Sequence, residues 1–136
     1  MRAEGEDFKK ADLDVFAAGE RFIADISNPD PLAESNLSDA AKEPLAVGDK
    51  RAAFKIKKYE EKYKRFGKFV PIVIESTGGM TKSCALALRD ILKAAKHSGV
   101  WASRDVVRGL KQRLCVAVAR GRANVILHAL RHSEVD

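Results

Sequence analysis

The chain has 136 residues, of which 46% are hydrophobic and 32% charged, so it can bury the core of one domain and is not a disordered segment. No apolar run approaches the roughly 18 residues that a membrane span requires, and the acidic N-terminus does not resemble a signal peptide. We therefore expect an intracellular protein with no membrane partner. The two cysteines and three histidines lack zinc-ligand spacing, so both cysteines are expected to be reduced core residues.

The net charge of +6 conceals an acidic first part and a basic remainder. Residues 1–49 carry 12 acidic and five basic residues, whereas residues 50–136 carry seven acidic and 20 basic ones. If both parts fold into one domain, anionic groups meet a basic surface that fits a polyanion such as nucleic acid. Composition is equally consistent with basic residues spread over solvated helix faces.

Residues 11–26 predict a β-hairpin, because two runs with Val, Ile and Phe flank a break that contains glycine. If the turn centres on Ala18-Gly19, Asp12 pairs with Asp25, and the two carboxylates lie on one face of the hairpin where they repel. A cation between them would remove that repulsion. The alternative is a solvated acidic face without a function.

The segment after the hairpin predicts a loop and then the clearest helix of the chain. Two prolines end the second strand, and residues 32–49 predict a loop with at most one short helical turn around Ser38–Glu43. Residues 50–66 predict a helix, with Asp49 as its N-cap and Gly67 as its C-cap.

This helix is amphipathic, and its lysines flank the apolar stripe. At about 100° per residue the stripe gathers Ala52, Ile56, Tyr59, Tyr63 and Phe66. Lys55 and Lys62 lie along one flank, and Lys58 lies further out on the same side. Lys55 is therefore expected nearer the rim where the helix meets a sheet, and Tyr59 is expected to pack inward.

The second half of the chain predicts one strand and two helices. Residues 69–75 form an apolar run typical of a buried strand, although Pro71 indicates an edge or a bulge. Residues 81–97 predict a helix. A last helix is expected from Arg104 to about Leu130, bent or divided by its two glycines. Its inward residues are expected to be Val106, Leu110, Leu114, Ala117 and Val118.

The predicted order is strand, strand, helix, strand, helix, helix. A hairpin followed by a helical crossover to a further strand gives an α/β or α+β sheet, with helices flanking it and two of them at the C-terminus. We expect this single domain over residues 11–132, after a flexible lead-in of residues 1–10.

The motifs and their order resemble the restriction-endonuclease-like domain of site-specific non-LTR retrotransposons, a branch of the PD-(D/E)XK nuclease fold. The resemblance is carried by Ala11-Asp12, by Asp25 and by the segment Lys55-x-x-Lys58-Tyr59. In addition, Phe69-Val-Pro-Ile-Val-Ile-Glu75-Ser-Thr-Gly and Arg120-Gly-Arg-Ala-Asn are similar to the tail of domains that accompany reverse transcriptases. The resemblance spans roughly residues 9 to 130, and each of its motifs is short.

The chain departs from the family pattern at three places. Ala11 replaces a proline that is not a ligand, and Ser27 stands where a lysine usually follows the second acid, so the catalytic lysine has to come from the helix. The usual first helix and strand are missing before Asp12. The chain is therefore read as a fragment of a larger element or as a degenerate copy.

The resemblance implies a metal-dependent DNA endonuclease of a retroelement, with a reverse transcriptase domain as partner and a nuclear location. Asp12 and Asp25 would hold Mg²⁺ or Mn²⁺, which polarises the phosphoryl oxygen and activates water. Lys55 or Lys58 would offset the charge of the transition state, and helical phase favours Lys55. Glu75 is a weaker third acid or a residue that faces solvent. The expected nucleic-acid-binding residues are Lys57, Tyr59 and Lys62.

Two other functions fit the same residues. One is a catalytically silent nucleic-acid-binding module that keeps the fold and the basic face, with RNA as an alternative to DNA. The other is a protein-interaction domain whose basic faces serve only for solvation.

Overall fold

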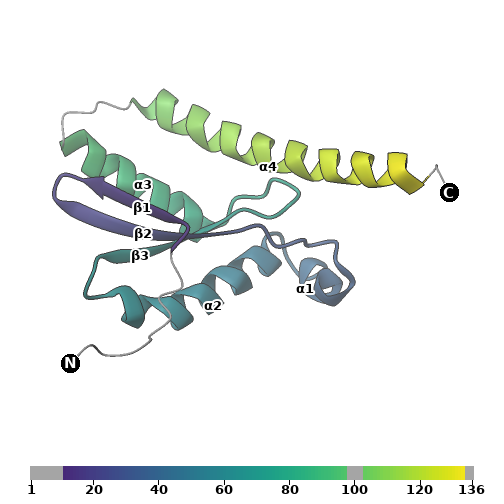
Figure 1. The fold of residues 1–136 in the computed structure, drawn as a ribbon, viewed down its shortest axis with the longest axis horizontal. Coiled ribbons are helices and arrows are strands. Elements are labelled where there is room, and N and C mark those ends of the chain that lie inside the picture. Colours follow the sequence, from purple (N-terminus) through teal and green to yellow (C-terminus); the bar gives the residue numbers. More distant parts are fainter. Residues whose placement is uncertain (1–10, 98–102, 134–136) are drawn as a thin grey trace.

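The computed structural model describes residues 11–97 and 103–133, which form an α+β domain with a small mixed sheet (Figure 1). The expected coarse class and order of strands and helices are confirmed, and the lead-in of residues 1–10 lies outside the described part. The elements are β1 (Leu13–Ala17), β2 (Glu20–Ser27), the 3-10 turn η1 (Glu34–Asn36), α1 (Leu37–Ala40), α2 (Ala46–Tyr63), β3 (Lys68–Val73), α3 (Lys82–His97) and α4 (Arg104–Ser133).

The hairpin forms with the predicted register. Ala18 and Gly19 both have positive φ, 50° and 76°, which is the backbone of a two-residue hairpin turn whose twist matches the strands. Leu13 pairs with Ala24 at the far end of the ladder, so the next pair outward is Asp12 and Asp25. β1 begins at Leu13, two residues after the start of the predicted hairpin, and Asp12 lies just outside it.

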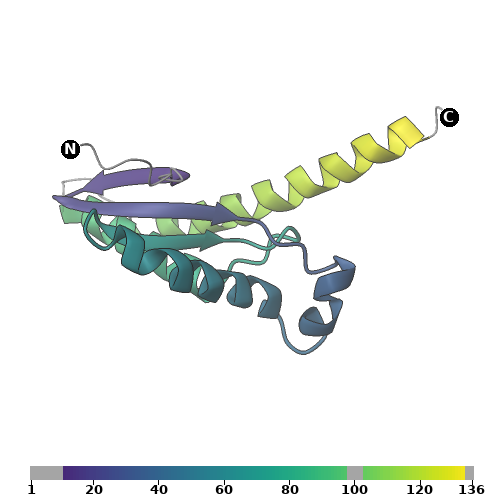
Figure 2. The ribbon, with the colours of Figure 1, turned by 60° about the horizontal axis from the view of Figure 1, so that its bottom comes forward.

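The sheet has the order β1-β2-β3, with β1 antiparallel and β3 parallel to β2. Within the described residues β3 is an edge strand, which fits the position of Pro71 because proline cannot donate to a ladder. The parallel pair β2 and β3 is connected through α2. Figures 1 and 2 show the strands lying between α2 and α3.

Each face of the sheet has its own apolar cluster. Because neighbouring strand residues point to opposite faces, Phe22 and Ile23 of β2 enter different clusters. The cluster under α3 contains Phe22, Ala24, Val70, Ala87 and Ala94. The cluster under α2 contains Ile23, Tyr59, Tyr63 and Phe69. Alternation then places Asp25, two residues after Ile23, on the α2 side of the sheet.

Helix α2 occupies a different span from the predicted 50–66. It begins at Ala46, after Leu45 in a left-handed conformation with φ of 65°, so Asp49 lies inside its first turns and is not the N-cap. It ends at Tyr63, which leaves Phe66 beyond the helix and 42% exposed. Gly67, the expected C-cap, allows a close approach of two parts of the backbone, because a Cβ at this position would lie 2.5 Å from the backbone oxygen of Arg21.

Helix α4 is one continuous helix of 30 residues, and neither of its glycines divides it. Arg122 forms an ion pair with Asp30 that ties the helix to the loop after β2. Beyond that contact the helix projects from the body (Figures 1 and 2). Its large apolar residues there are therefore exposed: Val125 64%, Ile126 46%, Leu127 51% and Leu130 56%.

The expected inward face of α4 is only partly correct. Leu114 and Val118 are half-buried, but Leu110 is 38% exposed and Ala117 is exposed as well. The side chain of Val106 lies outside the described part. No helix among the described residues is long and apolar enough to cross a membrane.

Candidate functional site

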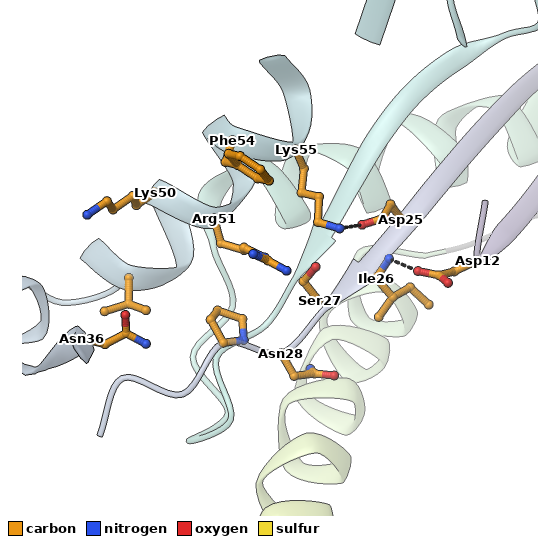
Figure 3. A pocket seen from close by; sticks show the side chains of 12 residues that line it. Asp12, Asp25, Ile26, Ser27, Asn28, Asn36, Lys50, Arg51, Phe54 and Lys55 are labelled. Atoms are coloured by element: carbon orange, nitrogen blue, oxygen red, sulfur yellow. Dashed lines mark hydrogen bonds and ion pairs between the residues drawn. The ribbon is translucent and has the colours of Figure 1, made fainter. Parts of the chain in front are cut away.

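A cleft of about 710 Å³ lies at the end of β2, beside the first turns of α2 (Figure 3). Its wall includes Asp12, Asp25, Lys50, Arg51, Phe54 and Lys55. The structure therefore brings together the two predicted acids and one of the two predicted lysines. It adds two cations and an aromatic ring that the sequence reasoning did not assign to a site.

The centre of the cleft wall is an ion pair between Asp25 and Lys55. The distance from Lys55 Nζ to Asp25 Oδ2 is 2.6 Å, and the two side chains are 10% and 17% exposed for lysine and aspartate, respectively. A charge buried to this degree needs a counter-charge, which explains why the lysine reaches down to the strand. Lys55 thus lies on the sheet-facing side of α2, deeper than the rim position expected from helical phase.

The contact is close but poorly directed. Asp25 Oδ2 is shielded from solvent, and no donor among the described residues is aligned with it as a hydrogen bond. The 2.6 Å distance therefore reflects an ion pair whose angles fall short of hydrogen-bond geometry. The ammonium group of Lys55 is therefore the charged partner of this shielded oxygen.

Asp12 lies beside this pair, as the hairpin register predicts (Figure 3). Its Oδ2 accepts a hydrogen bond of 2.7 Å from the backbone N–H of Ile26. That bond holds the start of β1 against the end of β2, beyond the last ladder pair. Its other oxygen has no hydrogen-bond donor in the described part of the chain, and the residue is exposed.

These donors fit a hard divalent cation with few protein ligands. Mg²⁺ is typically held by one or two carboxylates and keeps several waters. Asp12 and Asp25 supply such a pair from facing positions. No group of three or more His, Cys, Asp or Glu gathers as metal ligands within residues 11–97 and 103–133. Asp12 and Asp25 are the residues at the cleft that could hold such an ion.

The second predicted lysine points elsewhere. Lys58 is exposed and is not part of the cleft wall. Its Nζ lies 5.2 Å from the ring centroid of Tyr59 and 5.7 Å from that of Phe54. Of the two predicted lysines, Lys55 is therefore the one next to the acids.

Of the three residues expected to contact nucleic acid, two are exposed and one is buried. Lys57 and Lys62 are exposed on α2, whereas Tyr59 is only 5% exposed. The ring centroid of Tyr59 lies 5.7 Å from that of Phe69, which confirms the inward orientation of Tyr59. Burial raises the pKa of the neighbouring Tyr63, with smaller contributions from Tyr59 and from the two cleft carboxylates.

Both interpretations of Glu75 made from the sequence, a third acid of the site or a residue that faces solvent, are wrong, because it neither lines the cleft nor is exposed. It is 5% exposed, and its Oε1 accepts a hydrogen bond of 2.9 Å from the backbone N–H of Gly48 in the first turn of α2. An acidic group is stabilised at the positive end of a helix. A Cβ at Gly48 would lie 2.6 Å from Thr81, so the glycine permits this close approach. Glu75 thereby fixes the start of the helix that carries Lys55.

The sequence reasoning missed Lys50, Arg51 and Phe54. The signal was present, because Arg51 precedes Lys55 by one helical turn and therefore shares its side of the helix. The predicted helix start conceals this relation, because it puts residues 50 and 51 at the N-terminus of the helix, whereas they lie in its second turn. No protein-family model, curated protein or solved structure matches the chain.

Proposed function

We propose that this chain is a metal-dependent endonuclease domain with a PD-(D/E)XK-like arrangement, which hydrolyses phosphodiester bonds of DNA. The observation that carries the proposal is the pair of Asp25 and Lys55 on the wall of a cleft, with Asp12 opposite Asp25 in the hairpin. Two acids from adjacent strands and a lysine from the following helix are the residue types that phosphodiester hydrolysis requires.

The roles of the residues follow from their positions. Lys50 and Arg51 lie at the cleft wall on the first turns of α2 and would hold the phosphates of the bound strand. Lys55 has the ammonium group next to the acids and would offset the charge that builds on the phosphate being attacked. Asp12 and Asp25 would hold Mg²⁺ or Mn²⁺, which when bound polarises the phosphoryl oxygen and lowers the pKa of the attacking water.

The retrotransposon resemblance extends this proposal. It supports DNA as the substrate, a reverse transcriptase domain as the partner and the nucleus as the location. The hairpin, the lysine-bearing helix and the parallel strand β3 agree with the order of motifs on which the resemblance depends.

A catalytically silent nucleic-acid-binding module is the second candidate. It is favoured by the fact that both acids already have partners, since Asp25 pairs with Lys55 and Asp12 accepts the N–H of Ile26. Such a pair of acids is stable without a cation. The basic residues of the cleft would then bind phosphates with no cleavage.

Nicking of supercoiled plasmid DNA with Mg²⁺ or Mn²⁺ tests the proposal. Asp25→Asn and Asp12→Asn should abolish nicking, and asparagine at position 12 can still accept the N–H of Ile26. Asp14→Asn is the matched control, because Asp14 lies on the same hairpin but pairs with Arg21 at 2.6 Å, away from the cleft wall. Nicking should persist in that control.

Thermal stability provides a second readout. Mg²⁺ should raise the melting temperature of the parent by binding the native state, and should not raise that of Asp25→Asn. If the parent neither nicks DNA nor gains stability from either cation, yet binds DNA with a steep salt dependence, the silent module is correct. If it does not bind DNA at low salt, the protein-interaction domain is correct.

A further inference from the structure

Phe54 is an exposed aromatic side chain on the wall of the cleft, one residue before Lys55 (Figure 3). It is 52% exposed and belongs to neither of the two apolar clusters of the sheet. Burial of core surface therefore does not account for its presence here.

Two cations flank the ring. The Cζ atom of Arg51 lies 5.8 Å from the ring centroid of Phe54, and Lys58 Nζ lies 5.7 Å from it. Residues 51, 54 and 58 are spaced by three and four, so they form one ridge along α2. The ridge starts on the cleft wall with Arg51 and Phe54 and continues beyond it to Lys58, and it alternates positive charge with an aromatic face.

This combination is typical of surfaces that bind single-stranded nucleic acid. There, cations follow the phosphates while aromatic rings stack on bases, and the stacking tolerates any base because every base has a π-face. In a duplex the faces of each base are covered by its neighbours. A protein ring at the side of the backbone can therefore stack only on a base that is unpaired.

We propose that Phe54 stacks on an unpaired base beside the attacked phosphate, so that single-stranded or locally unpaired nucleic acid is the preferred substrate. This inference depends on the proposed function, since it names the substrate of the same cleft. Arg51 and Lys58 contact the phosphates on either side of the stacked base. Lys58, one of the two lysines that the resemblance offered as catalytic, thus has a binding role.

Phe16 provides a matched control. It is 71% exposed and has Arg21 Cζ at 5.2 Å from its ring centroid, so it repeats the pairing of an exposed ring with arginine. It lies on β1 and is not part of the cleft wall. Any effect of an exposed phenylalanine in general would appear equally in Phe16→Leu.

The binding experiment uses fluorescein-labelled oligothymidylate and a labelled hairpin duplex, with EDTA present so that no cleavage occurs. The parent should bind the single strand more tightly than the duplex. Phe54→Leu should lose about 5- to 160-fold in affinity for the single strand, the range of one lost base stack, and should keep its affinity for the duplex. Phe54→Tyr should restore the single-strand affinity, and Phe16→Leu should behave as the parent.

A spectroscopic variant reports stacking directly. In Phe54→Trp the single strand should quench the new tryptophan fluorescence and the duplex should not, with the parent and its single tryptophan, Trp101, as the background. Absent quenching, equal losses for both probes in Phe54→Leu, or no binding of either probe would overturn the inference. Because these readouts need no metal, they are separate from the nicking test. If the parent nicks plasmid DNA but gives one of these contrary binding results, only the role of Phe54 is refuted.

Discussion

Replacing Lys55 by methionine should destabilise the fold, because it leaves the carboxylate of Asp25 without its counter-charge. Removing one partner of a buried ion pair costs about 3–5 kcal/mol. Asp25 keeps 17% of its side chain exposed and borders the cleft, so water can reach part of the carboxylate. We therefore expect a loss of about 2–3 kcal/mol, which lowers the melting temperature of a domain of this size by roughly 10 °C.

The assay is urea unfolding of a double-mutant cycle with Asp25→Asn. Both single variants should be destabilised, because each leaves one polar group of the pair uncompensated. The double variant should be less destabilised than the sum of the two by about 1–3 kcal/mol. Additive losses, or a Lys55→Met variant as stable as the parent, would refute the buried pair. Under the proposed function, Mg²⁺ should also stabilise Lys55→Met more than the parent, since the carboxylate has lost its own cation.

Three further outcomes are expected. Burial raises the pKa of the Cys84 thiol to about 11, so maleimide at pH 8 should modify native Cys84 much more slowly than the half-buried Cys115, as measured by mass spectrometry of peptides. The hydrogen bond from Lys50 holds the pKa of Asp39 below its usual value, so this carboxylate contributes stability above its unfolded pKa and loses it as pH falls through its folded pKa. Asp39→Asn should therefore flatten the acid limb of stability against pH, measured by urea unfolding at a series of acidic pH values. Leu127→Lys should leave the free energy of unfolding within about 0.5 kcal/mol of the parent, since 51% of Leu127 is already exposed; a larger loss would show that the projecting end of α4 packs on something.

The local features of the hairpin were predictable because turn chemistry and strand periodicity are local. A glycine between two β-branched runs places the turn, and the turn fixes the register. From that register the pairing of Asp12 with Asp25 follows without any knowledge of the rest of the fold. The same holds for the edge position of β3, which Pro71 indicates through its missing N–H.

The start of α2 could not be predicted, because a residue far along the chain determines it. Glu75 accepts the N–H of Gly48 and stabilises a first turn whose own sequence contains a glycine. Local propensity placed the start at residue 50, since Gly48 weakens a helix when judged by itself. The burial of Lys55 was hidden for a similar reason, because its partner lies on a strand 30 positions earlier in the chain.

The inward face of α4 failed for a different reason. Periodicity indicates which residues of a helix share a side, but it does not indicate how far the body extends along the helix. The contact of Arg122 with Asp30 ties α4 to the loop after β2. Beyond it the helix projects from the body, and its large apolar residues there are exposed although they keep their spacing.

The charge asymmetry of the sequence reappears as the two sides of the cleft. Asp12 and Asp25 come from the acidic first part of the chain, and Lys50, Arg51 and Lys55 come from the basic remainder. The three cations lie within the first three turns of α2. A phosphate would be attracted here whether or not it is cut, so binding alone cannot distinguish the nuclease from the silent module. What only the nuclease requires is a cation held by Asp12 and Asp25, and the response of the parent to Mg²⁺ is therefore the decisive measurement.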